Sequence, residues 1–263
     1  MSKKDTIFFA HATGFQGSMY RQFFRRLEKS FDVLFFESFG RNPDFPIIDN
    51  WSNQALEVID FFKDKEAPVI GVGHSMGGIL NLLAASQKPN LFKLLILLDS
   101  PIMMGSLGIF LRLSKLIGVV EKMSPAKKSR NRKDRWKSRD EALDYFKNNS
   151  FFNKFSKECL SDYCEFGLKE VSGGVTLSIP VDEECSLFNA TPHNLDFMDT
   201  DNLPPIIYCQ ANRRVVTSQS SINRFVKKFN AKRVMVEGGH MFPMERPESA
   251  SEIIALIKEN LTY

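Results

Sequence analysis

The residue types best suited to chemistry in this chain are a serine, a histidine and several carboxylates. The string Gly73-His74-Ser75-Met76-Gly77 fits the pattern G-x-S-x-G, in which a sharp strand-to-helix turn presents the central serine at the edge of a sheet. A serine hydroxyl is a weak nucleophile by itself, so it requires a neighbouring base. The pattern therefore predicts nucleophilic catalysis by Ser75, provided that a base lies nearby.

His240 is the candidate base among the four histidines of the chain. It follows Gly238-Gly239 directly after the last expected strand, where a loop can bring an imidazole back to the sheet edge that carries Ser75. The other three histidines have different interpretations. His11 is expected to shape a loop, His74 to be buried beside the serine, and His193 to lie without a recognisable partner.

Short apolar runs alternate with segments of helical spacing over most of the chain. Six runs are expected to be strands: residues 6–10, 33–36, 68–72, 94–98, 206–209 and 233–236. Helices are expected at residues 21–27, after an N-cap at Asn50, and at residues 76–86, 218–229 and 247–261. Because the runs are apolar on both faces, the sequence predicts an α/β fold with a mostly parallel, doubly wound sheet.

The alternation stops at Pro101 and resumes only at about residue 204. Between these points no comparable apolar strand is evident, while helical spacing recurs at residues 108–120, 140–148 and 158–168, the second opened by a Ser138/Glu141 capping box. We therefore expect a core formed by residues 1–100 and 204–263, with residues 101–203 inserted as a helical cap or lid.

Three segments in the correct order resemble motifs of the α/β-hydrolase family. His11-Ala12-Thr13-Gly14-Phe15 is similar to its oxyanion loop, Gly73 to Gly78 to its nucleophile elbow, and Gly239-His240 through Glu248 to its histidine loop. The resemblance covers nearly the whole chain. It implies Ser75 as nucleophile, His240 as base, and the backbone N–H groups of Met76 and Thr13 as the oxyanion hole, with the cap selecting substrates.

Two positions depart from the family pattern. Ala12 replaces the usual glycine of the oxyanion loop, and Arg213 stands where the family's acid usually follows the penultimate strand. Asp99, at the end of the strand after the elbow helix, is the favoured acid because a neighbouring strand end can reach the same imidazole. Two alternatives stay open. The acid is a carboxylate just before the penultimate strand, namely Asp196, Asp199 or Asp201, or the triad has no acid at all.

The reaction expected from these residues is acyl transfer by a serine hydrolase of carboxylesterase type, with no cofactor and no metal. Thioester hydrolysis and carbon–carbon bond hydrolysis on the same triad stay open, and so does a non-catalytic protein that binds a small ligand. Tentative substrate contacts are His11, Phe15, Met103 and Phe110. The apolar side chains within residues 101–203 fit packing of the cap on the sheet as well as they fit a substrate pocket.

Composition limits the partners of this 263-residue chain. Its net charge of +4 is concentrated between Lys127 and Arg139, a run interpreted as solvated surface or as an attractor for an anionic substrate such as an acyl-CoA. A small ester or thioester is the expected partner, without nucleic acid or stable membrane insertion, and the oligomeric state stays open. Four cysteines without C-x-x-C spacing, and the absence of a signal-like or membrane-spanning segment, favour a cytoplasmic protein.

Overall fold

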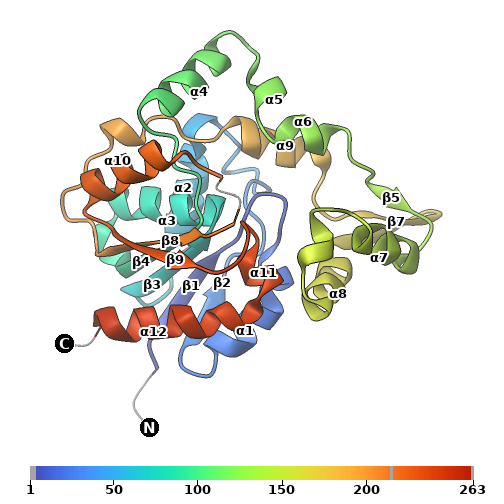
Figure 1. Cartoon of the computed structure of the whole chain (residues 1–263), viewed down its shortest axis with the longest axis horizontal. Helices are drawn as coiled ribbons and strands as arrows, with labels where there is room; N and C mark the ends of the chain where they lie inside the picture. Colours follow the sequence, from blue (N-terminus) through green and yellow to red (C-terminus); the bar gives the residue numbers. More distant parts are fainter. Residues whose placement is uncertain (1–3, 214–215, 262–263) are drawn as a thin grey trace.

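The computed structural model describes residues 4–213 and 216–261, and it is built on a central parallel sheet (Figure 1). The sheet has six strands in the order β2-β1-β3-β4-β8-β9, and every neighbouring pair is parallel. Their bounds are β1 Thr6–Ala10, β2 Asp32–Phe35, β3 Val69–His74, β4 Phe92–Leu98, β8 Ile206–Ala211 and β9 Lys232–Val236. This arrangement confirms the predicted fold class.

Helices cover both faces of the sheet because successive side chains of each strand point to opposite faces. In β1, Ile7 and Phe9 enter one core, whereas Phe8 and Ala10 enter the other. The first core is closed by α1 (Arg21–Leu27) and α12 (Ala250–Leu261). The second is closed by α2 (Ser52–Phe61), α3 (Met76–Gln87) and α10 (Gln219–Phe229).

The predicted helices and strands of the core agree with the structure within a few residues, with one error at a helix start. Asn50 is not the N-cap of α2. It lies at φ 59° within the 3-10 helix η2 (Asp49–Trp51), and its side-chain oxygen accepts a hydrogen bond from the backbone N–H of His193 at 3.0 Å. The asparagine is therefore used to hold a distant loop rather than its own helix.

Residues 101–203 contain helices and, contrary to expectation, a small sheet. The helices are α4 Ser106–Leu116, α5 Val120–Met123, α6 Ala126–Arg130, α7 Arg139–Lys147, α8 Lys157–Phe166 and α9 Val181–Asn189. The sheet is antiparallel in the order β5-β7-β6, with β5 Arg135–Trp136, β6 Leu168–Val171 and β7 Gly174–Leu177. These strands are two to four residues long and largely exposed on one face, so they lack the continuous apolar run that marked the core strands.

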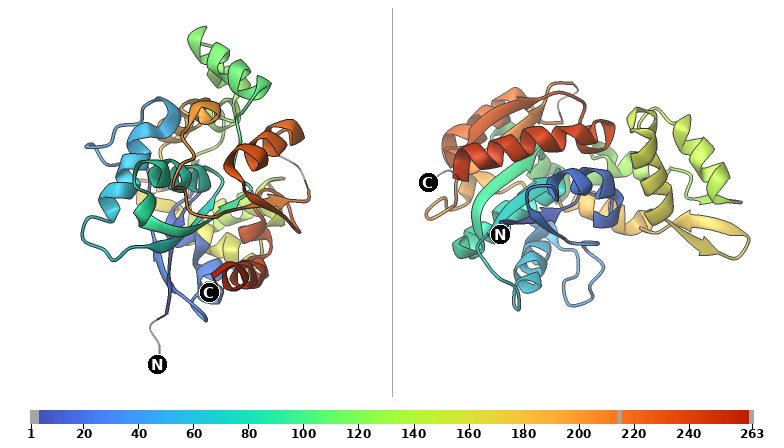
Figure 2. Two further views of the ribbon diagram at one scale, coloured as in Figure 1. Left: turned by 90° about the vertical axis from the view of Figure 1, so that its left-hand side faces the viewer. Right: turned by 90° about the horizontal axis from the view of Figure 1, so that it is seen from below.

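A lobe made of α7, α8 and the small sheet stands beside the central sheet (Figures 1 and 2). It is joined to the core by polar contacts, since the buried Asp162 of α8 forms an ion pair with Arg21 and accepts a hydrogen bond from Gln22 at 2.8 Å. Phe152, Phe155 and Tyr163 also belong to the same apolar core as β1. The lobe is thus packed against the first core.

The remaining elements are short. They are α11 Phe242–Glu245 and the 3-10 helices η1 Gly17–Tyr20, η3 Pro89–Leu91, η4 Phe152–Lys154, η5 Leu195–Phe197 and η6 Pro247–Ser249. All four cysteines lie within the described residues, where they are buried and none is in a disulfide. Among the described residues, no helix has both the length and the apolar character that crossing a bilayer demands.

Candidate active site

Ser75 lies at the turn between β3 and α3, in a backbone conformation that residues other than glycine rarely adopt. Its φ of 52° and ψ of −117° place it outside the favoured regions. The flanking glycines make the turn feasible. A Cβ on Gly73 would lie 2.3 Å from the Gly77 carbonyl carbon, and a Cβ on Gly77 would lie 2.0 Å from the Ala10 oxygen. The G-x-S-x-G spacing is therefore a steric requirement of this turn.

His240 reaches Ser75 from the loop that follows β9. Its Nε2 lies 3.1 Å from the Ser75 hydroxyl oxygen, which is hydrogen-bonding distance. The loop is held by backbone contacts: Gly238 donates to the Asn212 side chain at 3.1 Å, and Gly239 donates to the Glu245 carboxylate at 2.8 Å. These contacts fix the direction of the imidazole relative to the sheet edge.

Asp99 lies directly behind His240, as the sequence favoured. Its Oδ2 is 2.7 Å from Nδ1 of His240, while its Oδ1 accepts the backbone N–H of Ala211 at 3.0 Å. The carboxylate is almost fully buried, and the Asp99 backbone N–H donates to the Cys209 carbonyl of β8 at 2.7 Å. Bonds to β8 on both sides therefore orient the carboxylate towards the histidine. Ser75, His240 and Asp99 form one continuous hydrogen-bonded chain.

The competing carboxylates lie elsewhere. Asp196 accepts the Gly105 backbone N–H at 2.7 Å and pairs with Arg224, and Asp199 accepts the backbone N–H of Asp201 at 3.0 Å. Arg213, at the family's usual acid position, pairs with Glu237 at 2.8 Å. Its backbone N–H donates to the Gly238 carbonyl at 3.0 Å, so the residue supports the histidine loop without contacting the imidazole.

The two residues expected to supply the oxyanion hole lie side by side. The Thr13 hydroxyl donates to the Met76 sulfur at 3.3 Å, which links the loop after β1 to the start of α3. Met76 is the first residue of α3, so its backbone N–H has no partner within the helix. It lies at the positive end of the helix dipole, which favours negative charge. The arrangement offers a site for a developing oxyanion next to Ser75. The direction of the Thr13 N–H stays a prediction.

A buried hydrogen-bonded chain joins the oxyanion loop to the histidine loop. The Ala12 backbone N–H donates to the Tyr20 hydroxyl at 3.3 Å, and this hydroxyl donates to His74 Nδ1 at 2.8 Å. His74 Nε2 then donates to the backbone carbonyl of His240 at 2.8 Å. Sequence reasoning missed Tyr20 altogether and treated His74 as a buried neighbour, because nothing in their spacing indicates that they meet.

Burial keeps this chain in one protonation state. Burial, strengthened by the neighbouring His240 ring, holds the pKa of His74 well below its usual value, so the ring stays neutral with its proton on Nε2. Burial likewise raises the pKa of Tyr20, which remains a hydrogen-bond donor. His11 is also neutral, because burial lowers its pKa to about 4; its Nδ1 donates to the Ala12 carbonyl at 2.9 Å. It shapes the oxyanion loop, as expected.

Replacing Tyr20 with phenylalanine is expected to lower kcat on an ester substrate about tenfold, with little change in KM. The loss of two hydroxyl bonds frees the Ala12 backbone N–H and leaves His74, the ring that holds the His240 carbonyl, without its partner at Nδ1. It costs about 1–2 kcal/mol of stability. Steady-state kinetics and urea unfolding measure the two effects. The control is Ser178→Ala, which removes a hydroxyl bond to Phe166 in the lobe and should lower stability alone. A Tyr20→Phe enzyme with wild-type kcat would contradict the positioning role.

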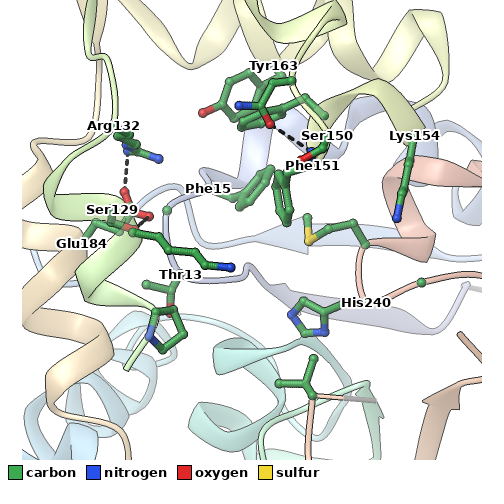
Figure 3. A pocket seen from close by; sticks show the side chains of 18 of the residues that line it. Thr13, Phe15, Ser129, Arg132, Ser150, Phe151, Lys154, Tyr163, Glu184 and His240 are labelled. Carbon is green, nitrogen blue, oxygen red and sulfur yellow. Dashed lines mark hydrogen bonds and ion pairs between the residues drawn. The ribbon is translucent and has the colours of Figure 1, made fainter. Parts of the chain in front are cut away.

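A cavity of about 600 Å³ opens at His240 (Figure 3). One side is apolar and includes Phe15, Phe151 and Tyr163, while Lys128, Arg132 and Lys154 bring positive charge. Ser75 does not itself line this cavity, but its hydroxyl contacts the imidazole that does. The cavity is thus bounded by the core on one side and by residues of the 101–203 segment on the other.

Of the tentative substrate contacts, Phe15 lines this cavity. His11 is buried below the oxyanion loop, and the Phe110 side chain on α4 is about half exposed; among the described residues, neither these two nor Met103 lines it. The cavity therefore gives no support to those three contacts. No group of three or more metal-ligating side chains occurs among the described residues.

The comparisons agree with this fold. Residues 7–252 match the sequence model of the α/β-hydrolase family, and the chain therefore belongs to that family. A probable esterase of rice (Oryza sativa subsp. japonica) is 27% identical over 105 residues, which cover 37% of this chain and 39% of the rice protein. The aligned part is thus well under half of either protein.

Solved structures show the same fold at low sequence identity. The peroxisomal α/β-hydrolase Lpx1 of Saccharomyces cerevisiae superposes with a TM-score of 0.73 at 19% identity, covering 98% of this chain and 78% of that one. E-2-(acetamidomethylene)succinate hydrolase superposes with a TM-score of 0.74 at 17% identity, covering 98% and 92%. At these identities the likeness defines the architecture alone.

Proposed function

We propose that this protein is a serine hydrolase that cleaves an ester-type bond through Ser75, His240 and Asp99. The observation that carries the proposal is the unbroken chain of hydrogen bonds from Asp99 to His240 at 2.7 Å and from His240 to Ser75 at 3.1 Å. A nucleophile, a base and a carboxylate that orients the base are the three parts that acyl transfer requires. A non-catalytic ligand-binding protein has no need of this geometry.

The steps follow from the positions of these atoms. The Ser75 oxygen attacks the carbonyl carbon while His240 Nε2 takes the hydroxyl proton, and the carbonyl oxygen gains the negative charge. The imidazolium, stabilised by Asp99, then gives that proton to the departing oxygen as the ester bond breaks. Water repeats the sequence on the acyl-enzyme and releases the acid. Backbone N–H groups of Met76 and Thr13 hold the oxyanion in both halves of the reaction.

We further propose that residues 101–203 act as the cap that selects the substrate. Lys128, Phe151 and Phe188 come from three separate parts of this segment, and all three line the cavity at His240. The position of the segment supports this role, because a substrate in the cavity contacts it on one side and His240 on the other. Aromatic side chains on this wall suit an apolar acyl group.

A fluorophosphonate probe and a burst assay test the proposed mechanism. The probe is expected to add once per chain, and peptide mass spectrometry should place the adduct on Ser75. With p-nitrophenyl butyrate, rapid mixing should release about one equivalent of p-nitrophenol before the slower steady state, because acyl-enzyme accumulates. An adduct on Ser129 or Ser150, which line the same cavity, would contradict the assignment, as would hydrolysis by a chain that the probe leaves unlabelled.

A further inference from the structure

Basic side chains surround the histidine loop on its outer side. A second cavity, of about 410 Å³, is lined by Lys154, Arg213, Gly239, Glu245 and Arg246. Lys154, Gly239 and Glu245 also line the cavity at His240, so the two cavities share a wall. A substrate whose reacting bond lies at His240 can therefore extend past the histidine loop and place a second group in the second cavity.

Among the described residues of this wall, Lys154 is the cation that is available to bind a ligand. Arg213 and Arg246 both pair with Glu237, at 2.8 and 3.4 Å, and the Glu245 carboxylate accepts the Gly239 backbone N–H at 2.8 Å. Within residues 4–213 and 216–261, no carboxylate forms an ion pair with Lys154. Figure 3 shows its side chain reaching down towards the side of the cavity on which His240 lies.

Arg213 adds positive charge at the position where the family usually carries the acid that contacts the histidine. Because Asp99 supplies the carboxylate for His240, the loop after β8 is released from that role, and it carries a guanidinium into the wall of the second cavity. Arg132, by contrast, is neutralised by the buried Glu184 on the opposite wall of the first cavity. Lys154, Arg213 and Arg246 therefore place positive charge beside the histidine loop, in addition to the charge that Lys128 brings to the first cavity.

The chemistry of His240 decides which part of a substrate lies there. In the proposed mechanism, Nε2 gives its proton to the departing atom, so the departing group must lie on the histidine side, whereas the carbonyl oxygen faces Thr13 and Met76. Gly239, Glu245 and Arg246 of the second cavity all belong to the histidine loop. We propose that the departing group of the substrate carries a carboxylate or a phosphate, and that Lys154, assisted by Arg213, binds this anion. The inference rests on the proposed hydrolase function.

Matched butyrate esters test the proposal. Three phenyl butyrates that differ only in the group at the 4-position, namely a neutral carboxamide, a carboxylate and a phosphate, present the same acyl group with departing groups of rising charge. The measured quantity is the kcat/KM for each anionic ester divided by that for the carboxamide, compared between variants so that intrinsic leaving-group reactivity cancels. If Lys154→Gln lowers the ratio more for the phosphate than for the carboxylate, the departing group is a phosphorylated one, and the reverse would identify a carboxylate.

Lys154→Gln is expected to lower this ratio about fivefold, and Lys154→Arg should keep it. Arg213→Gln should lower it about twofold, since its charge is shared with Glu237. The control is Lys157→Gln, which removes the same charge from an exposed position that lines neither cavity and should leave the ratio unchanged. Raising sodium chloride to about 0.5 M should also reduce the wild-type ratio, because salt screens the ammonium. An unchanged ratio in Lys154→Gln would overturn the proposal.

Binding to a Ser75→Ala chain separates this inference from the proposed function. Titration calorimetry with the carboxylate and carboxamide esters requires no turnover, and the carboxylate ester should bind about fivefold more tightly, a preference that Lys154→Gln removes. If this preference is present while the wild-type chain hydrolyses none of the esters, the hydrolase proposal fails and the anion site stands. Equal binding of both esters, together with hydrolysis of both by the wild type, would overturn the anion site alone.

Discussion

Replacing Ser75 with alanine is expected to lower kcat for p-nitrophenyl butyrate by about 10⁴- to 10⁶-fold. The substitution removes the attacking oxygen, so only the oxyanion donors and substrate binding are left to assist attack by water. Alanine keeps the Cβ that the turn already accommodates at φ 52°, and the Ser75 backbone N–H still donates to the Leu98 carbonyl at 2.9 Å. The fold should therefore persist, and substrate binding with it.

Stopped-flow and steady-state assays measure this loss, and urea unfolding checks the fold. The control is Ser86→Ala in the same helix, whose hydroxyl bonds only to the Leu83 carbonyl at 2.9 Å and which should keep wild-type kcat. A Ser75→Ala protein that retains more than about one hundredth of the wild-type rate would exclude this serine as nucleophile.

Replacing Asp99 with asparagine is expected to lower kcat about 10⁴-fold, as the matching change does in serine proteases. The amide cannot stabilise an imidazolium, and its NH₂ group favours the wrong tautomer of His240. The hydrogen bond from Ala211 N–H to the side chain at 3.0 Å can be kept by the amide oxygen, so the geometry around β8 should survive. We expect KM to change much less than kcat.

Asp196→Asn is the matched comparison for Asp99→Asn. Asp196 was a candidate acid on the basis of the sequence, but its side chain binds Gly105 and Arg224. Its substitution should leave kcat within about twofold of the wild type, because these contacts involve neither Ser75 nor His240. The reverse pattern, with activity lost in Asp196→Asn and kept in Asp99→Asn, would refute the assignment of the acid.

The order of helices and strands in the core could be predicted from local patterns. Strands such as 94–98 are continuous apolar runs because both faces of a central parallel strand are covered, and helices such as 21–27 repeat their apolar residues at helical spacing. The small sheet of residues 135–177 lacks this local pattern, because its strands are short and partly exposed, and it was therefore missed. Asn50 failed as a cap because a distant backbone N–H, that of His193, uses its side chain.

The candidate site likewise contains residues that local sequence patterns indicate and one residue whose role depends on the tertiary structure. Ser75 and His240 could be proposed from the sequence because a steep turn demands glycines at fixed spacing around one residue, and because Gly238-Gly239 follows a strand directly. Asp99 was one of several open carboxylates, since its role depends on strand order: only β8 separates the end of β4 from the histidine loop.

The sequence by itself therefore determined the family, the elements of the core, and the residues that we propose as nucleophile and base, all of which depend on neighbouring residues. Only the tertiary structure decided which carboxylate faces His240, that Tyr20 and His74 connect the two loops, and that Lys154 and Arg213 meet in one wall. The physical reason is that these contacts join segments tens to hundreds of residues apart. Their distances are set by the packing of whole elements, which local spacing does not encode.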